Sequence, residues 1–183
     1  FIADIKRELR VKYLRTMPDG GELAADVSAE IVPVKEYNKA TGIELEIGDV
    51  YALHIRNNSN EKLYYTVLDI YPDNTVEVMY PYKGKEPADY IVDKKNVVIR
   101  KLAVSKGSPA GVEFLKIIVS KEPMDLRSVF EKKITRDNMQ SFQTLLDDLF
   151  NEKPGPSATR ADISGIKTDE TGIITVSFII KKD

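Results

Sequence analysis

The chain has 183 residues, of which 42% are hydrophobic and 31% are charged, so it can bury a core and is not a disordered tail. Its net charge of −2 lacks the basic excess that phosphate contacts need, and we predict no nucleic-acid partner. Its lack of cysteine excludes disulfides, thiolate metal sites and cysteine nucleophiles. No apolar run approaches the roughly 18 residues of a membrane helix, so no transmembrane segment is predicted. The chain begins with Phe1 rather than Met and shows no signal-peptide pattern, so we expect it to be cut from something longer.

The first segment of the chain predicts a β-hairpin. Residues 1–17 fit both a strand and a helix, and we favour the strand because charged and apolar side chains alternate along it. Residues 18–21 (Pro-Asp-Gly-Gly) are typical of a tight turn. Apolar and polar residues then alternate over residues 23–31, the period of a half-buried strand. Pro33 has no amide hydrogen, so it predicts a strand end or an edge strand.

The centre of the chain predicts an antiparallel meander. Three aromatic and β-branched runs, residues 50–55, 63–70 and 75–80, are separated by short turns at residues 57–60 and 72–74. Strands at this spacing without helices between them are typical of a sandwich or a barrel. Two further strands are predicted at residues 97–99 and 112–119.

The third of these runs leads into a Tyr-Pro-Tyr corner. Pro81 predicts that the strand ends at Tyr80, and the alternation places Val78 and Tyr80 on one face of it. If this corner has a binding role, we expect Tyr82 and Lys83 to be exposed and to form a small contact patch for a partner.

The last part of the chain changes character. Residues 124–132 and 136–150 predict two peripheral α-helices, the second with Thr135 as its N-cap. A terminal hairpin is predicted from residues 160–167 and 173–181.

Two organisations fit these elements. In both, residues 43–133 form a mainly β, antiparallel domain, a sandwich or a barrel-like meander. Residues 1–34 and 135–183 then form either a small α+β subdomain into which the β domain is inserted, or edge additions to the same domain. We keep both organisations open.

The residues offer little catalytic chemistry. His54 is the only histidine, and its position in the middle of a strand predicts a strand-face side chain rather than a catalytic base. Asp69, Asp73 and Asn74 flank one turn, but the glycine of a calcium loop is missing. We therefore predict no catalytic residue, no metal site and no cofactor.

Several motifs of the central segment carry a family resemblance. They are Gly48-Asp49, Leu63-Tyr64-Tyr65, Tyr80-Pro81, residues 109–113 (Pro-Ala-Gly-Val-Glu) and residues 120–123 (Ser-Lys-Glu-Pro). In this order and spacing they resemble the bacterial family known as domain of unknown function 4384, over about residues 43–130. The chain departs from the family at Asp73-Asn74, where members commonly carry Asp-Gly.

The resemblance implies association rather than catalysis. Such domains are often found downstream of caspase-like peptidase domains in bacteria and carry no known catalytic constellation. The resemblance thus implies a non-catalytic accessory or protein-interaction domain, with a protein partner or an attached peptidase whose catalytic dyad lies outside these residues. It also favours a bacterial periplasmic or cell-surface location.

Two other functions are weighed beside this one. In a carbohydrate- or cell-envelope-binding sandwich, Tyr64 or Tyr65 and Tyr82 stack on sugars while Asp69 and Asn74 bind hydroxyls, although the chain has no tryptophan. A hydrolase is the least favoured, because the sequence pairs no two carboxylates at a defined spacing. A pocket that holds two acids about 5–10 Å apart, as glycoside hydrolysis needs, would favour it again. The sequence names no small-molecule ligand.

Overall fold

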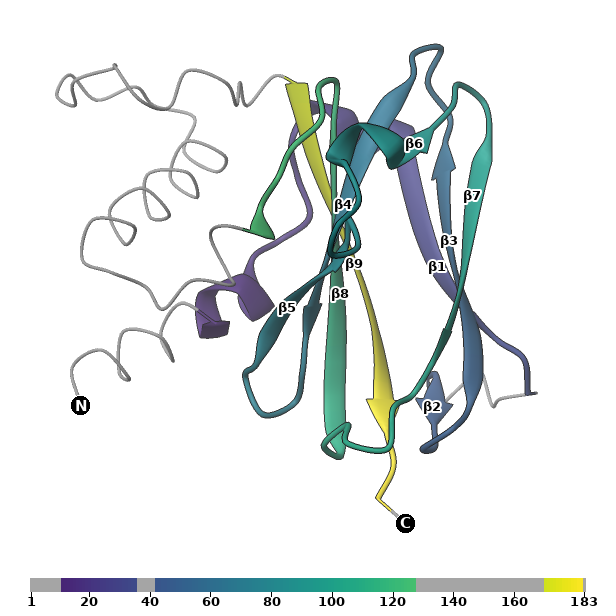
Figure 1. Cartoon of the computed structure of the whole chain (residues 1–183), viewed down its shortest axis with the longest axis vertical. Helices are drawn as coiled ribbons and strands as arrows, with labels where there is room; N and C mark the ends of the chain where they lie inside the picture. Colours follow the sequence, from purple (N-terminus) through teal and green to yellow (C-terminus); the bar gives the residue numbers. More distant parts are fainter. Residues whose placement is uncertain (1–10, 36–41, 128–169, 183) are drawn as a thin grey trace, which may run out of the picture.

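The computed structural model describes residues 11–35, 42–127 and 170–182, which form two β-sheets packed face to face (Figure 1). Almost all strand pairs are antiparallel, and the core lies between the sheets. The predicted fold class, a mainly β antiparallel sandwich, is confirmed.

The smaller sheet has three strands in the order β1-β3-β7. They are β1 (Val27–Pro33), β3 (Val50–Asn57) and β7 (Val97–Ala103). Leu53 and Ile55 of β3 are fully buried against the other sheet, because alternate side chains of a strand face the same way. β1 lies at the edge and ends at Pro33, which confirms the prediction made from that proline.

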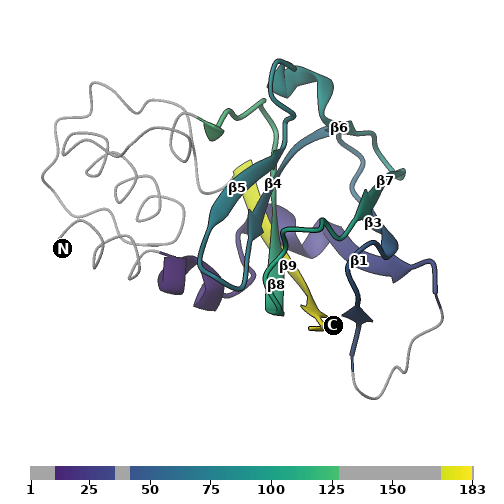
Figure 2. The same ribbon diagram turned by 60° about the horizontal axis from the view of Figure 1, so that its bottom comes forward.

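The larger sheet has six strands in the order β2-β9-β8-β4-β5, with β6 also paired to β4. Only β2 and β9 run parallel to each other. Figure 2 shows β8 and β9 crossing the middle of the molecule, with the smaller sheet beside them. The strands are β2 (Glu44–Leu45), β4 (Leu63–Ile70), β5 (Val76–Tyr80), β6 (Ile91–Val92), β8 (Gly111–Ser120) and β9 (Thr171–Ile180).

Both faces of the larger sheet are covered by apolar side chains. Its inner face packs against the smaller sheet, with Leu63, Val67 and Ile117 fully buried. On its outer face, Val11 and Leu14 pack against Leu68 and Ile118. A near-continuous apolar run such as residues 63–70 is expected of a strand buried on both faces.

The start of the described chain corrects the predicted hairpin. Residues 11–16 are helical rather than extended, because Val11 and Leu14, three positions apart, cover the outer face of the larger sheet. A 3-10 helix, η1 (Glu22–Asp26), follows, so the strand begins at Val27 rather than at residue 23. β1 pairs with β3, and Gly20 instead bridges to Ile173 of β9.

The predicted meander is only partly correct. β4 and β5 do form an antiparallel pair, but β3 and β4 belong to different sheets. The turn between them crosses from one sheet to the other and is held by Asn57. The buried Asn57 Nδ2 donates to the carbonyl oxygens of Glu61 at 2.7 Å and Val92 at 3.1 Å.

A β-bulge changes the direction of the Tyr80 side chain. Val67 pairs with Tyr80 but the next residue, Leu68, pairs with Val78, which leaves Met79 as an extra residue in β5. Val78 therefore packs on the outer face of the sheet while Tyr80 packs in the core between the sheets. The prediction that these two side chains share a face is wrong, whereas the predicted end of the strand at Tyr80 is confirmed.

Strands from both ends of the chain lie within the sheets of the central strands. β9 pairs with β8 along its whole length, from Thr171 with Ser120 to Ile180 with Gly111. The predicted helix at residues 136–150, most of that at 124–132 and the strand at 160–167 lie outside the described residues. The division of the chain into domains therefore stays a prediction.

Candidate functional site

A pocket of about 300 Å³ lies at one end of the sandwich, between β4, β5 and β8 of the larger sheet and the end of β7. This volume is at the lower end of the range for small-molecule sites. The charged residues that line the pocket are Asp69, Glu77, Lys83 and Glu113. Three tyrosines, Tyr51, Tyr71 and Tyr82, line it as well.

The sheet register brings the two deepest carboxyls together. Asp69 pairs with Leu115 across β4 and β8, so Glu113, two residues before Leu115, is its diagonal neighbour on the same inner face. Glu77 of β5 lies directly opposite Asp69 on the other side. Asp69 and Glu113 are only 3% and 4% exposed. The two carboxyls therefore lie on the same buried face of the sheet as the apolar side chains of the core.

One oxygen of each buried carboxyl lacks a hydrogen-bond donor among the described residues. Asp69 Oδ1 and Glu113 Oε2 accept no hydrogen bond from any other described residue. Two ionised carboxylates can only accept, so a hydrogen bond forms between them only when one of the two is protonated. The pair is therefore expected to hold one proton in common, as carboxyls in contact do.

Burial sets the charge state of this carboxyl pair. Burial and the negative charge of Glu113 raise the pKa of Asp69 to about 8. Burial raises the pKa of Glu113 to about 7, and the hydrogen bond with Asp69 opposes that rise. The two groups titrate as a unit, and the proton they hold is lost only near or above neutral pH.

Tyrosine hydroxyls surround the carboxyls. The Tyr71 hydroxyl has one proton, which it donates to Glu77 Oε2 at 3.3 Å or to Asp69, and its hydrogen bond to Asp69 favours the ionised form of that carboxyl. Burial raises the pKa of Tyr51 and Tyr71, and the nearby carboxylates raise it further. Both hydroxyls therefore stay protonated and can donate hydrogen bonds at the wall of the pocket.

The rim of the pocket is polar and exposed. The Tyr82 side chain is 60% exposed, and Lys83 beside it is exposed as well. The loop that carries them is fixed from two sides. Tyr82 N donates to Tyr90 Oη at 2.9 Å, and Arg127 Nη1 donates to the carbonyl oxygens of Tyr82 at 3.1 Å and Lys85 at 2.9 Å.

Three of the predicted binding residues come together here, and three do not. Asp69, Tyr82 and Lys83 line the pocket, whereas Tyr64, Tyr65 and Asn74 lie elsewhere. Tyr64 is half-buried, with Lys62 Nζ 5.0 Å from its ring centroid.

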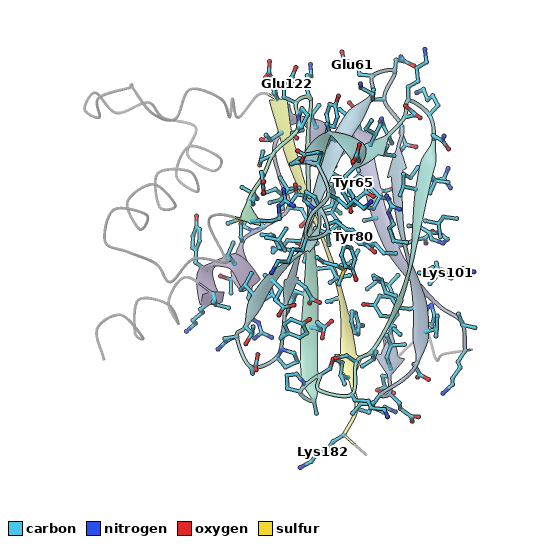
Figure 3. The ribbon with its side chains drawn as sticks, viewed as in Figure 1. Glu61, Tyr65, Tyr80, Lys101, Glu122 and Lys182 are labelled. Carbon is cyan, nitrogen blue, oxygen red and sulfur yellow. The ribbon has the colours of Figure 1, made fainter. Side chains whose placement is uncertain are left out.

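The other two residues are engaged within the fold. Tyr65 is 2% exposed in the core, where it has no free face for a ligand; Figure 3 shows it beside Tyr80 in the middle of the sandwich. Asn74 lies in the turn after β4, and its Oδ1 accepts a 2.7 Å hydrogen bond from Arg15.

His54 lies away from the pocket on the outer side of β3. Its Nδ1 is 3.4 Å from Glu30 Oε1 of the neighbouring strand, which confirms the prediction of a strand-face side chain. Asp73 Oδ1 accepts a 2.9 Å hydrogen bond from Thr75 N, which is ordinary turn chemistry. Over residues 11–35, 42–127 and 170–182 no three His, Asp or Glu side chains are grouped so as to hold a metal.

Sequence reasoning missed the residues that complete the pocket, Tyr51, Tyr71, Glu77 and Glu113. A signal for Glu113 was present: it keeps the two-residue phase of Leu115, Ile117 and Val119, which are fully buried. An acidic side chain in phase with a buried apolar face predicts a buried acid.

No helix in the described part of the chain is both long enough and apolar enough to cross a membrane. Neither a scan against protein-family models nor a search of curated proteins found a match for this chain.

Proposed function

We propose that this chain is a non-catalytic recognition domain, which binds a ligand or partner through the acidic pocket and works beside a caspase-like peptidase or another catalytic domain. The observation that carries this is the Asp69–Glu113 pair, buried at the base of the pocket with two oxygens that have no donor in the described part of the chain. Buried polar atoms in proteins almost always have partners, so a pair left incomplete beside an open pocket favours a ligand that completes it.

The spacing of the pair favours recognition over glycoside hydrolysis. Asp69 and Glu113 are close enough to share a hydrogen bond. Carboxyls that cleave glycosides stand about 5–9.5 Å apart, so that a sugar or a water fits between them. His54 is not among the lining residues, and the chain has no cysteine that could serve as a nucleophile.

The rim supports an interaction with a partner. Tyr82 and Lys83 form an exposed aromatic and charged patch, and such side chains make contacts at protein interfaces. Arg127 fixes this loop through two carbonyl oxygens, so the patch costs little conformational entropy to order on binding.

A ligand survey of the full chain tests the proposal. We would titrate it with organic amines and guanidines, small carboxylates and neutral sugars, and record amide chemical shifts by NMR. We expect at least one class to shift the amides of Asp69, Tyr82 and Glu113 in a saturable manner. We also expect no turnover of peptide, ester or glycoside reporter substrates.

Two outcomes contradict the proposal. If no class shifts these amides at millimolar concentration, the pocket is not a recognition site. If the chain hydrolyses a reporter and Asp69→Asn abolishes that turnover, the pair is catalytic and the domain is an enzyme.

A carbohydrate ligand is the second candidate, favoured by the exposed ring of Tyr82 beside the carboxyl oxygens of the pocket. A sugar that stacks on this ring would donate its hydroxyls to Glu77 or Glu113. In that case a neutral sugar shifts the pocket amides, and Tyr82→Ala removes the effect.

A further inference from the structure

We propose that the pocket takes an organic cation, an alkylammonium or guanidinium group of the kind that ends a lysine or arginine side chain, and holds it between Asp69 and Glu113. This inference rests on the proposed function and names its ligand class.

The charges that line the pocket favour a cation. Three carboxyls, Asp69, Glu77 and Glu113, face it, against one basic group, Lys83. Lys83 and Glu77 are exposed, whereas Asp69 and Glu113 are buried at the base. A positive group that enters therefore meets the carboxyls after it has passed the exposed rim, where solvent screens the charge of Lys83.

The hydrogen-bonding capacity at the base favours the same ligand. Asp69 Oδ1 and Glu113 Oε2 are both acceptors without a donor among the residues that the structure describes, and each has lost contact with bulk water. Ammonium and guanidinium groups carry three and five donors and no acceptor, so they can satisfy both oxygens at once. They also supply the positive charge that two buried carboxylates need, which a sugar hydroxyl does not.

The same interior already holds a guanidinium group elsewhere. Arg100 of β7 is enclosed by the rings of Tyr65, Tyr80 and Tyr90, with its Cζ 5.4–5.7 Å from their centroids. The pocket repeats this chemistry with Tyr51 and Tyr71 on its walls and carboxyls at its base, but no cation of the chain occupies its base among the described residues. A ligand would supply the group that Arg100 supplies to the other tyrosines.

Binding of a cation is linked to a proton. The groups that face the carboxyl pair are Glu77 on β5, Tyr71 after β4 and Tyr51 on β3, with Lys83 at the rim. The proton that Asp69 and Glu113 hold between them leaves the pair with one negative charge instead of two. A cation held beside the pair favours the doubly ionised form, so binding releases that proton to solvent. Because the pair ionises near or above neutral pH, affinity should rise as the pH increases from about 6 to about 8.

Isothermal titration calorimetry on the full chain tests this inference. The probes are agmatine, cadaverine and Nα-acetyl-lysine methylamide, and the matched neutral probe is the last compound acetylated on Nε. We expect the charged probes to bind at pH 8 at least tenfold more tightly than at pH 6, and the neutral probe not to bind. Measurements in buffers of different ionisation enthalpy should show the release of about one proton.

Variants connect the binding to the carboxyl pair. Glu113→Gln keeps the shape of the side chain and should weaken binding at least tenfold and remove the proton release. Glu22→Gln, an equal change of charge at an exposed position outside the pocket, should leave both unchanged. Glu77→Gln, at the exposed edge, provides a second pocket variant if Glu113→Gln does not fold, and should weaken binding severalfold.

The outcomes separate this inference from the proposed function. If a neutral sugar shifts the pocket amides and no cation binds, the cation inference is overturned while the recognition function stands. If no probe binds, both fall. Equal binding of cations to wild type and Glu113→Gln also overturns the inference, because the site then lies elsewhere. Binding of the lysine derivative points to a protein side chain as the source, and binding of the free diamines alone points to a small molecule.

Discussion

Arg100 Nε donates a 2.7 Å hydrogen bond to the hydroxyl of Tyr65, and this contact joins the two sheets of the sandwich. Arg100 lies on β7 of the smaller sheet and Tyr65 on β4 of the larger one. The guanidinium also lies over the rings of Tyr80 and Tyr90, the first of which reaches the core through the bulge in β5. A charged side chain thus takes the place of an apolar one at the centre of the interface between the sheets.

Replacing Arg100 should destabilise the fold in a way that charge alone does not explain. Arg100→Lys keeps the charge but loses the planar stacking and the hydrogen bond, and we expect a loss of about 1–2 kcal/mol in the free energy of unfolding. Arg100→Met should lose about 2–3 kcal/mol. Urea unfolding measures both, with Arg56→Met at an exposed position of β3 as the control. Equal stability of Arg100→Lys and wild type would contradict the structural role of the guanidinium.

The carboxyl pair should make the ligand-free protein less stable as pH rises. The pKa values of Asp69 and Glu113 are raised in the folded state to about 8 and about 7, from 3.8 and 4.5. The folded state therefore binds more protons than the unfolded chain in this range, so the stabilising contribution is complete below the unfolded values and is lost as pH rises through the folded ones.

Glu113→Gln isolates that effect. The amide can donate to Asp69 without a second negative charge, so the variant should gain stability relative to wild type between about pH 5 and about pH 8, by about 2–4 kcal/mol at the upper end. Urea midpoints across this range measure the difference. A difference that does not change with pH would show that the two carboxyls are not coupled.

Lys116 should anchor the N-terminal helical segment to the larger sheet. Its Nζ is buried and donates to Met17 O at 2.6 Å and to Thr175 Oγ1 at 2.8 Å. Lys116→Met leaves the Met17 carbonyl without this donor, and we expect a loss of about 1–3 kcal/mol together with faster hydrogen exchange at residues 14–17. The exposed Lys101→Met is the matched control.

The same variant should alter the alkaline pH dependence. Burial lowers the pKa of Lys116 below 10.5, so the unfolded chain binds the proton more tightly than the folded one in the window below that value. Wild-type stability relative to Lys116→Met should therefore rise as pH increases toward 10.5. A constant difference would indicate that the lysine is not desolvated.

Gly172→Ala should destabilise the contact between β9 and η1. A methyl group at Gly172 would overlap the backbone nitrogen of Ala24, and the Gly20–Ile173 bridge beside it holds the two segments close together. We expect a loss of about 1–3 kcal/mol, measured by thermal or urea unfolding. Gly107→Ala, which meets nothing within 4 Å, should change stability by less than about 0.5 kcal/mol. Similar values for the two variants would refute the close approach.

The strands were predictable where local pattern and burial agree. The alternation and β-branched residues of 63–70 and 112–119 correspond to β4 and β8, because each strand carries its own apolar faces. The partition into two sheets was not predictable from these patterns. It depends on contacts between distant segments, such as the hydrogen bond from Asn57 to Val92.

The same limit applies to the helical segment and to the pocket. Residues 11–16 fit both the two-residue period of a strand and the 3.6-residue period of a helix. The apolar outer face of the larger sheet, on which Val11 and Leu14 pack, favours the helix. Asp69 was singled out for its place near a turn, but its importance comes from its register with Glu113, which lies more than forty positions away in the sequence. Register between distant strands is a property of the assembled sheet and cannot be read from one strand.

The position of β9 also has a consequence for the synthesis of the protein. A ribosome makes the chain in order, so β2 and β8 are complete long before the strand that lies between them. Until residues 171–180 emerge, β8 presents an unpaired row of amide and carbonyl groups to the cell, the kind of edge that recruits foreign strands. A synthetic peptide with the β9 sequence, added to a nascent chain that lacks it, would compete for that row and reveal how long it stays open.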